Sequence, residues 1–330
     1  MSVLKGKRIL VTGGAGFVGS HIVEALVIEG CKEIVVIDNM VRGRTENLAA
    51  ALTSGRVVVV EGDIRDQHLI EDLLHNTDTV FHQAALRITH CAAEPAEAMQ
   101  VMVDATFNLL QACVRQKVRK IVMASSASVY GMAEAFPTTE DHPPYNNRTL
   151  YGAAKSFGEG LLRSFNDMYG LDYVALRYFN VYGPRMDIHG RYTEVMVRWM
   201  ERIDVGLPPI IFGDGSQTMD MINVEDVARA NVLAATSPAT DAVFNVGSQT
   251  ETSLLELAEL MATAMGRPAL KPVHEKARTV NPVPRRVASG ASALQHLGFA
   301  PTIGVVEGIA GLVAWWRQEV RRNQIPEEAL

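Results

Sequence analysis

The stretch VTGGAGFVGS, residues 11–20, decides the fold. It begins with the last residue of the apolar run 8–11 and contains Gly13, Gly16 and Gly19 where a helix-forming segment begins. Gly13 permits a tight turn, Gly16 lets a pyrophosphate approach the backbone, and Gly19 lets helix and strand pack closely. The free N–H groups and the positive end of the helix dipole then face the phosphates. A purely structural turn can have the same spacing, so the rest of the chain has to decide.

Six short apolar runs alternate with helix-length segments through the first half of the chain. Each run is rich in β-branched residues and apolar on both faces, as expected for strands buried between two helix layers. This alternation predicts an α/β fold with a Rossmann-type, doubly wound parallel sheet. The runs are 8–11, 33–38, 56–61, 79–84, 120–125 and 173–179.

The helical segments and their spacing divide the chain into two parts. Residues 1–180 are expected to form a dinucleotide-binding domain. Residues 181–330, which prolines and glycines interrupt more often, are expected to form mainly a smaller C-terminal α/β substrate lobe, with some chain returning to the first domain. The expected helices are 16–29, 94–116, 151–169, 192–204, 224–236, 252–265 and 304–322.

Composition and charge argue against several classes of protein. The chain has 330 residues, 21% of them charged, and its net charge of −6 is unlike the basic footprint of nucleic-acid-binding proteins. No apolar run reaches the ~18 residues of a membrane-spanning helix. The N-terminus also lacks the pattern of a signal peptide, so we expect a cytoplasmic protein. Cys31, Cys91 and Cys113 lack CxxC spacing and are expected to be reduced, mostly buried thiols, with no metal site.

An acid at the end of the second run favours NAD as the cofactor. Asp38 follows Gly19 by 19 residues, where a carboxylate accepts hydrogen bonds from an adenosine ribose and repels a 2′-phosphate. Arg42 and Arg44 keep NADP open as the alternative. Asp63 comes two residues after the third run, where the fold would contact the adenine, although it is equally suited to cap a helix.

A tyrosine and a lysine four residues apart are candidates for acid–base chemistry. Tyr151 and Lys155 share one face of an expected helix, and an adjacent ammonium lowers the pKa of a phenol that ordinarily titrates near ~10. The stretch SSASVYG, residues 125–131, ends the fifth run and brings hydroxyls to the same edge of the sheet. A Tyr-x-x-x-Lys spacing is common on surface helices. Its coincidence with the serine stretch and the glycine turn indicates a catalytic site.

Together these motifs resemble the extended short-chain dehydrogenases/reductases of the NAD-dependent nucleotide-sugar epimerase/dehydratase family, most closely the UDP-glucose and other UDP-sugar 4-epimerases. The likeness runs through VTGGAGFVGSHIVEAL, VVIDN, GDIRD, FHQAA, SSASVYG, YGAAK, LRYFNVYGPR, IFGDGSQTMDMINVEDVA and FNVGS. It implies the catalytic triad Ser126, Tyr151 and Lys155. The implied NAD site is Gly13, Gly16, Phe17, Val18, Gly19, Asp38, Asn39, Asp63, Ile64, Ala84, Ala85, Tyr151, Lys155 and Tyr178. The implied substrate site is Ser126, Ser128, Tyr151 and Asn180, with Asn180 at the diphosphate.

The two residues after the implied catalytic serine bear on the type of reaction. Dehydratases of the family carry an Asp-Glu pair there, decarboxylases a glutamate at the second position, and 3,5-epimerases a cysteine, whereas this chain has Ala127 and Ser128. The resemblance therefore implies a 4-epimerase. Tyr151 would take the proton of the sugar 4-hydroxyl while NAD takes the hydride from C4, and the 4-keto sugar would receive it on its other face.

Two other functions stay open. A dehydratase or decarboxylase would have to use other groups, such as Glu134, Glu140 or His142 in the loop after SSASVYG. The second is a non-catalytic NAD-binding sensor, against which the intact triad argues.

The chain departs from the family at positions that hold the diphosphate. Met219 stands where an arginine is usual, and Thr279 falls on a second such position. Substrate anchoring is therefore expected to be rearranged. Four arginines could bind the diphosphate instead, although each taken alone is more typical of a surface charge. They are Arg185, Arg191, Arg278 and Arg286. His90 is expected in an exposed loop.

The two long helices 94–116 and 151–169 each have a face that the sheet does not use. The resemblance implies that they pair across a two-fold axis as a four-helix bundle, which gives a homodimer. A monomer that covers these faces with loops is the alternative. No membrane or nucleic-acid partner is expected.

Overall fold

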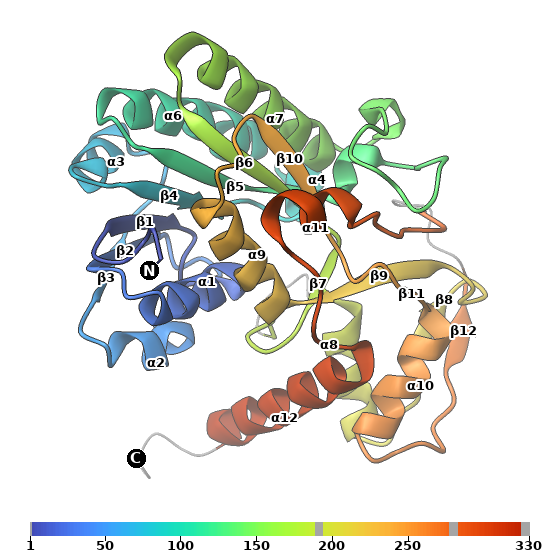
Figure 1. Ribbon diagram of the computed structural model, residues 1–330. Helices are drawn as coiled ribbons and strands as arrows, with labels where there is room; N and C mark the ends of the chain where they lie inside the picture. The colour runs from blue at the N-terminus through green and yellow to red at the C-terminus, as the bar shows by residue number, and fades with distance from the viewer. Residues whose placement is uncertain (1, 189–193, 277–282, 325–330) are drawn as a thin grey trace.

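The computed structural model describes residues 2–188, 194–276 and 283–324. Its centre is a seven-stranded parallel sheet in the order β10-β6-β5-β4-β1-β2-β3 (Figure 1). This sheet confirms the predicted Rossmann-type α/β fold. The order reverses between β1 and β4, which is where doubly wound sheets bind ligands. Its first six strands are β1 (Arg8–Thr12), β2 (Glu33–Asp38), β3 (Val57–Glu61), β4 (Thr79–His82), β5 (Lys120–Ser126) and β6 (Asp172–Tyr178).

The seventh strand, β10 (Ala242–Val246), is absent from the predicted set. It pairs in parallel with β6 at the edge of the sheet, with Ala242 opposite Val174 and Val246 opposite Tyr178. Its apolar run is short and is interrupted by Asn245, so it carries little strand signal of its own. Through β10 the second half of the chain contributes a strand to the seven-stranded sheet.

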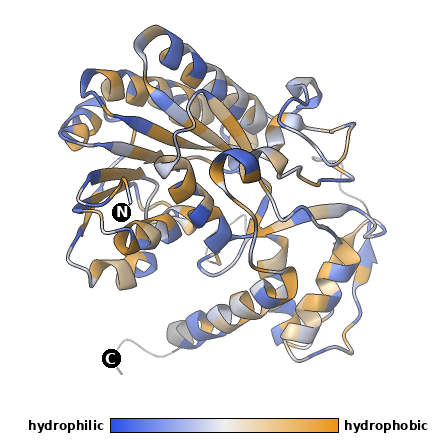
Figure 2. Ribbon diagram, in the orientation of Figure 1, coloured by the Kyte–Doolittle hydropathy of each residue, from blue (hydrophilic) through white to orange (hydrophobic). Residues whose placement is uncertain are grey.

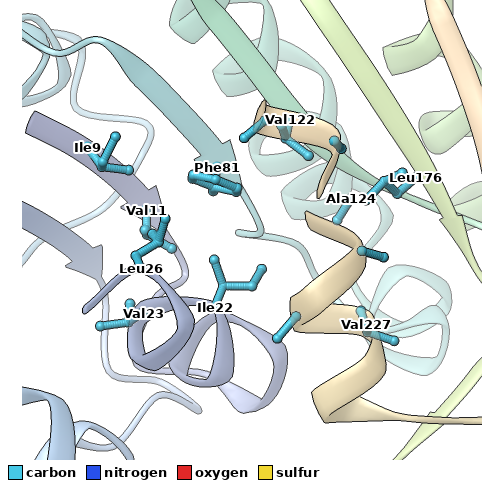
Figure 3. Packing of buried hydrophobic residues seen from close by; sticks show 14 of the residues in the cluster. Ile9, Val11, Ile22, Val23, Leu26, Phe81, Val122, Ala124, Leu176 and Val227 are labelled. Atoms are coloured by element: carbon cyan, nitrogen blue, oxygen red, sulfur yellow. The ribbon is translucent and has the colours of Figure 1, made fainter. Parts of the chain in front are cut away.

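Helices cover both faces of the sheet (Figure 1). Figure 3 shows Ile22 of helix α1 and Val227 of helix α9 on the face that carries Phe81 and Val122. Leu10 points to the opposite core, so β1 is apolar on both faces, as predicted. One layer is α1 (Phe17–Ile28), α2 (Ala49–Leu52), α9 (Val224–Thr236) and α11 (Ala291–Leu297). The other is α3 (Gln67–Leu74), α4 (Ile88–Ala93), α5 (Pro95–Met99), α6 (Ala105–Arg115) and α7 (Leu150–Tyr169).

The helix predicted over 94–116 is divided into three segments. A π-helical turn, Gln100–Asp104, joins α5 to α6. The short helices α3, α4 and α11 were not predicted, because segments of six to eight residues carry too few turns for a clear periodicity.

The second lobe has its own apolar core, to which Trp199, Met200, Leu257 and Leu312 contribute. Figure 2 shows hydrophobic and hydrophilic positions side by side along α10 and α12, as amphipathic helices require. The first part of the expected helix 192–204 lies outside the described residues. The elements are α8 (Val195–Asp204), α10 (Leu254–Ala264), α12 (Val305–Gln324), β7 (Asn180–Tyr182), β8 (Ile210–Phe212), β9 (Thr218–Asn223), β11 (Glu251–Ser253) and β12 (Val273–Glu275).

Two general expectations can be compared with this fold. Cys31, Cys91 and Cys113 are free and buried, as predicted. In the part of the chain that the structure covers, the helices are all too short or too polar to traverse a bilayer.

Candidate active site

A cavity of about 1820 Å³ opens where the strands β1, β4 and β5 end, and both parts of the chain line it. The structure brings every site residue predicted from the sequence to this one cavity. These residues are Gly13, Gly16, Phe17, Val18, Gly19, Asp38, Asn39, Asp63, Ile64, Ala84, Ala85, Ser126, Ser128, Tyr151, Lys155, Tyr178 and Asn180.

The glycine turn leaves room that any side chain would fill. Gly13 has a positive φ of 66°, and a Cβ there would lie 2.8 Å from the Ala84 nitrogen. A Cβ on Gly19 would overlap the Gly13 carbonyl oxygen and approach the Gly14 Cα to 2.7 Å. Gly16 caps helix α1 without a side-chain hydrogen bond, so the first N–H groups of the helix can receive an anion. This cradle fits the pyrophosphate of a dinucleotide.

Asp38 ties the glycine turn to the loop after β2. Its Oδ2 accepts from the Ala15 N–H at 3.1 Å and its Oδ1 from the Met40 N–H at 3.0 Å. Burial raises the pKa of this carboxyl, and the two hydrogen bonds oppose that rise. Arg42, which kept NADP open, forms an ion pair with Asp187 at 3.1 Å. The structure therefore shows Arg42 engaged with an acid, which favours NAD.

Asp63 does not cap a helix. Its side chain pairs with Arg65 at 2.6 Å, and this hydrogen bond holds the pKa of Asp63 below its usual range. The cap of helix α3 is Asp66, which accepts from the Leu69 N–H. Helix α3 begins at Gln67, so the alternative role of Asp63 as a helix cap was wrong.

Ser126 and Tyr151 come from two different elements and meet at the cavity. Ser126 is the last residue of β5, and its Oγ accepts from the Ser128 N–H at 3.1 Å. Tyr151 lies in the first turn of α7, which begins after Thr149 caps the Gly152 N–H. The Ser126 hydroxyl lies close enough to the Tyr151 phenol to lower its pKa.

Lys155 lies one helical turn after Tyr151, and its ammonium faces both the ring and the strand. Its Nζ lies 5.8 Å from the centre of the Tyr151 ring and donates to the Ala124 carbonyl at 2.7 Å. Burial lowers the pKa of Lys155 to about 8. Burial also raises the pKa of Tyr151 to about 12, while the Ser126 hydrogen bond and the charge of Arg286 lower it. Burial therefore opposes the charged form of both groups.

Three expectations about charged groups were wrong. His90 lies on helix α4, where its Nε2 is 2.9 Å from Glu97 Oε2, rather than in an exposed loop. Arg185 pairs with Glu24 and is largely enclosed. Arg286 lines the cavity, and its Nε is buried with no hydrogen-bond partner among the described residues.

Arg286 lies beside the methionine that replaces the usual arginine. Its N–H donates to the Thr218 carbonyl at 3.0 Å, which places it next to Met219 on β9. Both side chains line the cavity. The other candidates, Arg191 and Arg278, and the unusual Thr279 lie outside the described residues.

The loop after SSASVYG does not reach the cavity in the described structure. Glu140 accepts from the Asn245 N–H at 2.8 Å, and Glu134 accepts from Asn146 at 2.7 Å. His142 accepts from the Glu134 N–H at 3.1 Å. The cavity lining includes none of Glu134, Glu140 and His142.

Sequence reasoning missed an ionic cluster at the cavity wall. Asp187 lies within ion-pair distance of both Arg42 and Arg87, at 3.1 Å and 4.0 Å. Arg87 also approaches Glu194 at 3.4 Å. The position of Arg87 just after FHQAA was the available signal, whereas nothing local distinguishes Asp187 from other loop acids.

Comparisons with known proteins agree with this geometry. The family model described as "NAD dependent epimerase/dehydratase family" matches residues 9–247. UDP-glucose 4-epimerase from Mycolicibacterium smegmatis is 36% identical over 315 residues, covering 94% of this chain and 99% of that protein. dTDP-glucose 4,6-dehydratase from an Actinoplanes species is 33% identical over 324 residues, covering 94% and 98%. The crystal structure of UDP-glucose 4-epimerase from Thermotoga maritima with UDP-glucose matches with a TM-score of 0.88 at 34% identity, covering 95% and 99%.

Proposed function

Because the chain belongs to the NAD-dependent epimerase/dehydratase family, we propose that it is an isomerase that epimerises a UDP-sugar at C4. The observation that carries the proposal is the meeting of Ser126, Tyr151 and Lys155 at the cavity that also contains the glycine turn. The similarity to two UDP-glucose 4-epimerases supports the same conclusion.

The residues of the chain divide the chemistry between binding and proton transfer. Tyr151 takes the proton of the sugar 4-hydroxyl, and the Ser126 hydroxyl holds the same oxygen. Lys155, charged at neutral pH, stabilises the phenolate, and Arg286 adds a second positive charge. NAD, which the glycine turn and Asp38 would hold, supplies the reversible hydride acceptor and a further positive charge when bound. The cavity, at about 1820 Å³, leaves room for the 4-keto sugar to present its other face.

The residues after Ser126 favour epimerisation over the alternative dehydration or decarboxylation. Loss of the C6 hydroxyl needs an acid and a base at the sugar. Ala127 and Ser128, which occupy the next positions, supply neither. A dehydratase is among the relatives, so the reaction type has to be decided by its product.

Arg286 is our candidate for the missing diphosphate anchor. Its backbone pairs with β9 next to Met219, its Nε is buried, and both residues line the cavity, so its guanidinium is the candidate to replace the arginine that the family has on β9. A guanidinium binds phosphate oxygens in a bidentate manner. Asn180 lines the same wall and is proposed to assist.

The product test uses purified protein, NAD and a panel of nucleotide sugars, with proton NMR to read the configuration at each carbon. We expect a 4-epimer of unchanged mass and, for Tyr151→Phe, nearly complete loss of turnover with NAD still bound. Release of water or carbon dioxide would refute the epimerase. Absence of turnover across the panel would leave the NAD-binding sensor as the function.

We also propose a homodimer through α5, α6 and α7. Five apolar side chains on this side of the molecule are exposed, namely Met99, Phe107, Phe157, Met168 and Tyr169. Exposed apolar side chains gathered on one side of a protein are typical of a contact with another chain. Sedimentation at micromolar concentration should give the mass of two chains, and a single-chain mass would refute the dimer. A cytoplasmic location and a division near residue 180 between cofactor and substrate domains complete the proposal.

A further inference from the structure

Helix α7 contacts the end of strand β5 at three positions spaced one turn apart. The contacts are Tyr151 to Ser126, Lys155 to Ala124, and Glu159 to Ser125. Side chains at i, i+4 and i+8 lie on one face of a helix. This face of α7 therefore contacts the last three residues of β5. Two of the contacts belong to the proposed catalytic groups. The third has no place in the chemistry described above.

The third contact is part of a buried ion pair between Glu159 and Arg177, to which Ser125 is hydrogen-bonded, and we call these three residues the ionic lock. The Ser125 Oγ donates to Glu159 Oε1 at 2.5 Å, and Arg177 donates to both Glu159 oxygens at 2.9 and 2.6 Å. The side chains of Glu159 and Arg177 are each only 11% exposed. A buried carboxylate is tolerated only when its charge is paired and its oxygens are hydrogen-bonded, and here both conditions hold.

Arg177 connects this lock to the rest of the sheet. It lies on β6 directly opposite Ser125 of β5. It also donates to the Tyr130 hydroxyl at 2.8 Å and to the Glu140 carbonyl at 2.9 Å. Tyr130 in turn donates to Asn245 of β10 at 2.7 Å. Glu159 is therefore fixed against three adjacent strands.

We propose that Glu159 is a positioning residue that sets the register of α7 against β5, and with it the separation of the Ser126 hydroxyl and the Tyr151 phenol. This inference rests on the proposed function, because that separation matters only if the two groups share a substrate oxygen. Gly158, beside Glu159, lets the Met123 side chain of β5 pack closely against α7. The hydrogen bonds of Glu159 to Ser125 and Arg177 add directional contacts at this turn.

Glu159 also acts on the charge of Lys155. The titratable groups that face Lys155 are Glu159 and Tyr151 on α7, Cys91 on α4 and His82 on β4. Burial lowers the pKa of Lys155, and the charges of Cys91 and Glu159 raise it. Neutralising Glu159 also leaves the Arg177 charge unbalanced. Loss of the Glu159 charge should therefore lower the pKa of Lys155 further.

The test compares Glu159→Gln and Glu159→Asp with the matched control Asp78→Asn. Asp78 is similarly enclosed, at 14% exposure, and pairs with Lys7 and Arg119 at the amino end of β4, outside the cavity lining. For Glu159→Gln we expect kcat to fall by about tenfold or more, the cost of a small misplacement, with little change in KM. The alkaline limb of its pH profile should move to lower pH. Glu159→Asp keeps the charge and should keep the limb at its wild-type position while lowering kcat.

The control separates positioning from a general loss of stability. Asp78→Asn should lower the urea midpoint of unfolding without altering kcat or the pH profile. Wild-type kcat and pH profile in Glu159→Gln would overturn the inference, and so would an equal loss of kcat in Asp78→Asn. If the wild-type protein turns over no nucleotide sugar, the proposed function fails. A crystal structure of Glu159→Gln then decides the positioning, and an unchanged distance between Ser126 Oγ and the Tyr151 oxygen would refute it.

Discussion

Gly19→Ala adds one methyl group at the place where helix α1 crosses the glycine turn. The new Cβ would lie 2.7 Å from the Gly14 Cα and 2.9 Å from the Gly13 carbonyl carbon, whereas 3.4 Å is the lower end of ordinary contact. The turn must therefore move by at least about 0.7 Å, since the Gly13 carbonyl oxygen lies closer still. A shift of that size stretches an N–H to phosphate bond from about 2.9 Å past the limit of a hydrogen bond.

The expected loss follows from the bonds that the shift breaks. Two charge-assisted hydrogen bonds, at about 1.5–3 kcal/mol each, amount to about 3–6 kcal/mol. NAD affinity should then fall by about 10²- to 10⁴-fold. The assay is a fluorescence titration of the cofactor-free protein with NADH.

The matched control is Gly311→Ala in helix α12. A Cβ there meets nothing within 4 Å, so the substitution should stabilise the helix by up to about 1 kcal/mol and leave NADH affinity unchanged. NADH affinity of Gly19→Ala within about threefold of wild type, with a native circular dichroism spectrum, would refute the reasoning about the turn.

Two further predictions concern charge. Arg286→Met should raise KM for the nucleotide sugar by about 10- to 100-fold, because it removes a charge-assisted phosphate contact, and an unchanged KM in steady-state kinetics would exclude Arg286 as the anchor. Burial lowers the pKa of His82 to about 3 and that of His21 to about 4. The unfolded chain therefore binds protons below about pH 6.5 that the folded chain does not, so stability should fall between pH 6.5 and 4 by up to about 1.4 kcal/mol per pH unit for each histidine. Urea midpoints measured across this range check it, and a flat profile down to pH 4.5 would contradict the burial argument.

The features that the sequence predicted are those that local patterns encode. The six strands of the first half alternate with helices, and each carries its own apolar run. The glycine turn, Asp38 and the Tyr151–Lys155 pair are each defined by spacing within one element or one turn. The parallel fold then brings the ends of these elements to a common edge, so the cavity follows once the topology is known.

The features that were missed depend on partners far away in the sequence. Arg286 reads as a surface charge until its segment pairs with β9, some 68 residues earlier at Thr218. His90 reads as a loop residue because helix α4 is too short to show a period. Glu159 lies on a helix whose role was already explained by Tyr151 and Lys155. Only the pairing of β5 with β6 shows that it has a partner in Arg177.

Burial opposes the charged forms of Tyr151 and Lys155, on which the proposed reaction depends. It holds the proton on Tyr151 and destabilises the charge on Lys155, which is the charge that a phenolate needs beside it. A dry site without compensation would therefore be inactive at neutral pH. The structure compensates on both sides, since Ser126 and Arg286 favour the phenolate and Glu159 favours the ammonium. Because Glu159 in turn requires Arg177 and Ser125 to be buried at all, the activity of the phenol depends on residues that never touch the substrate.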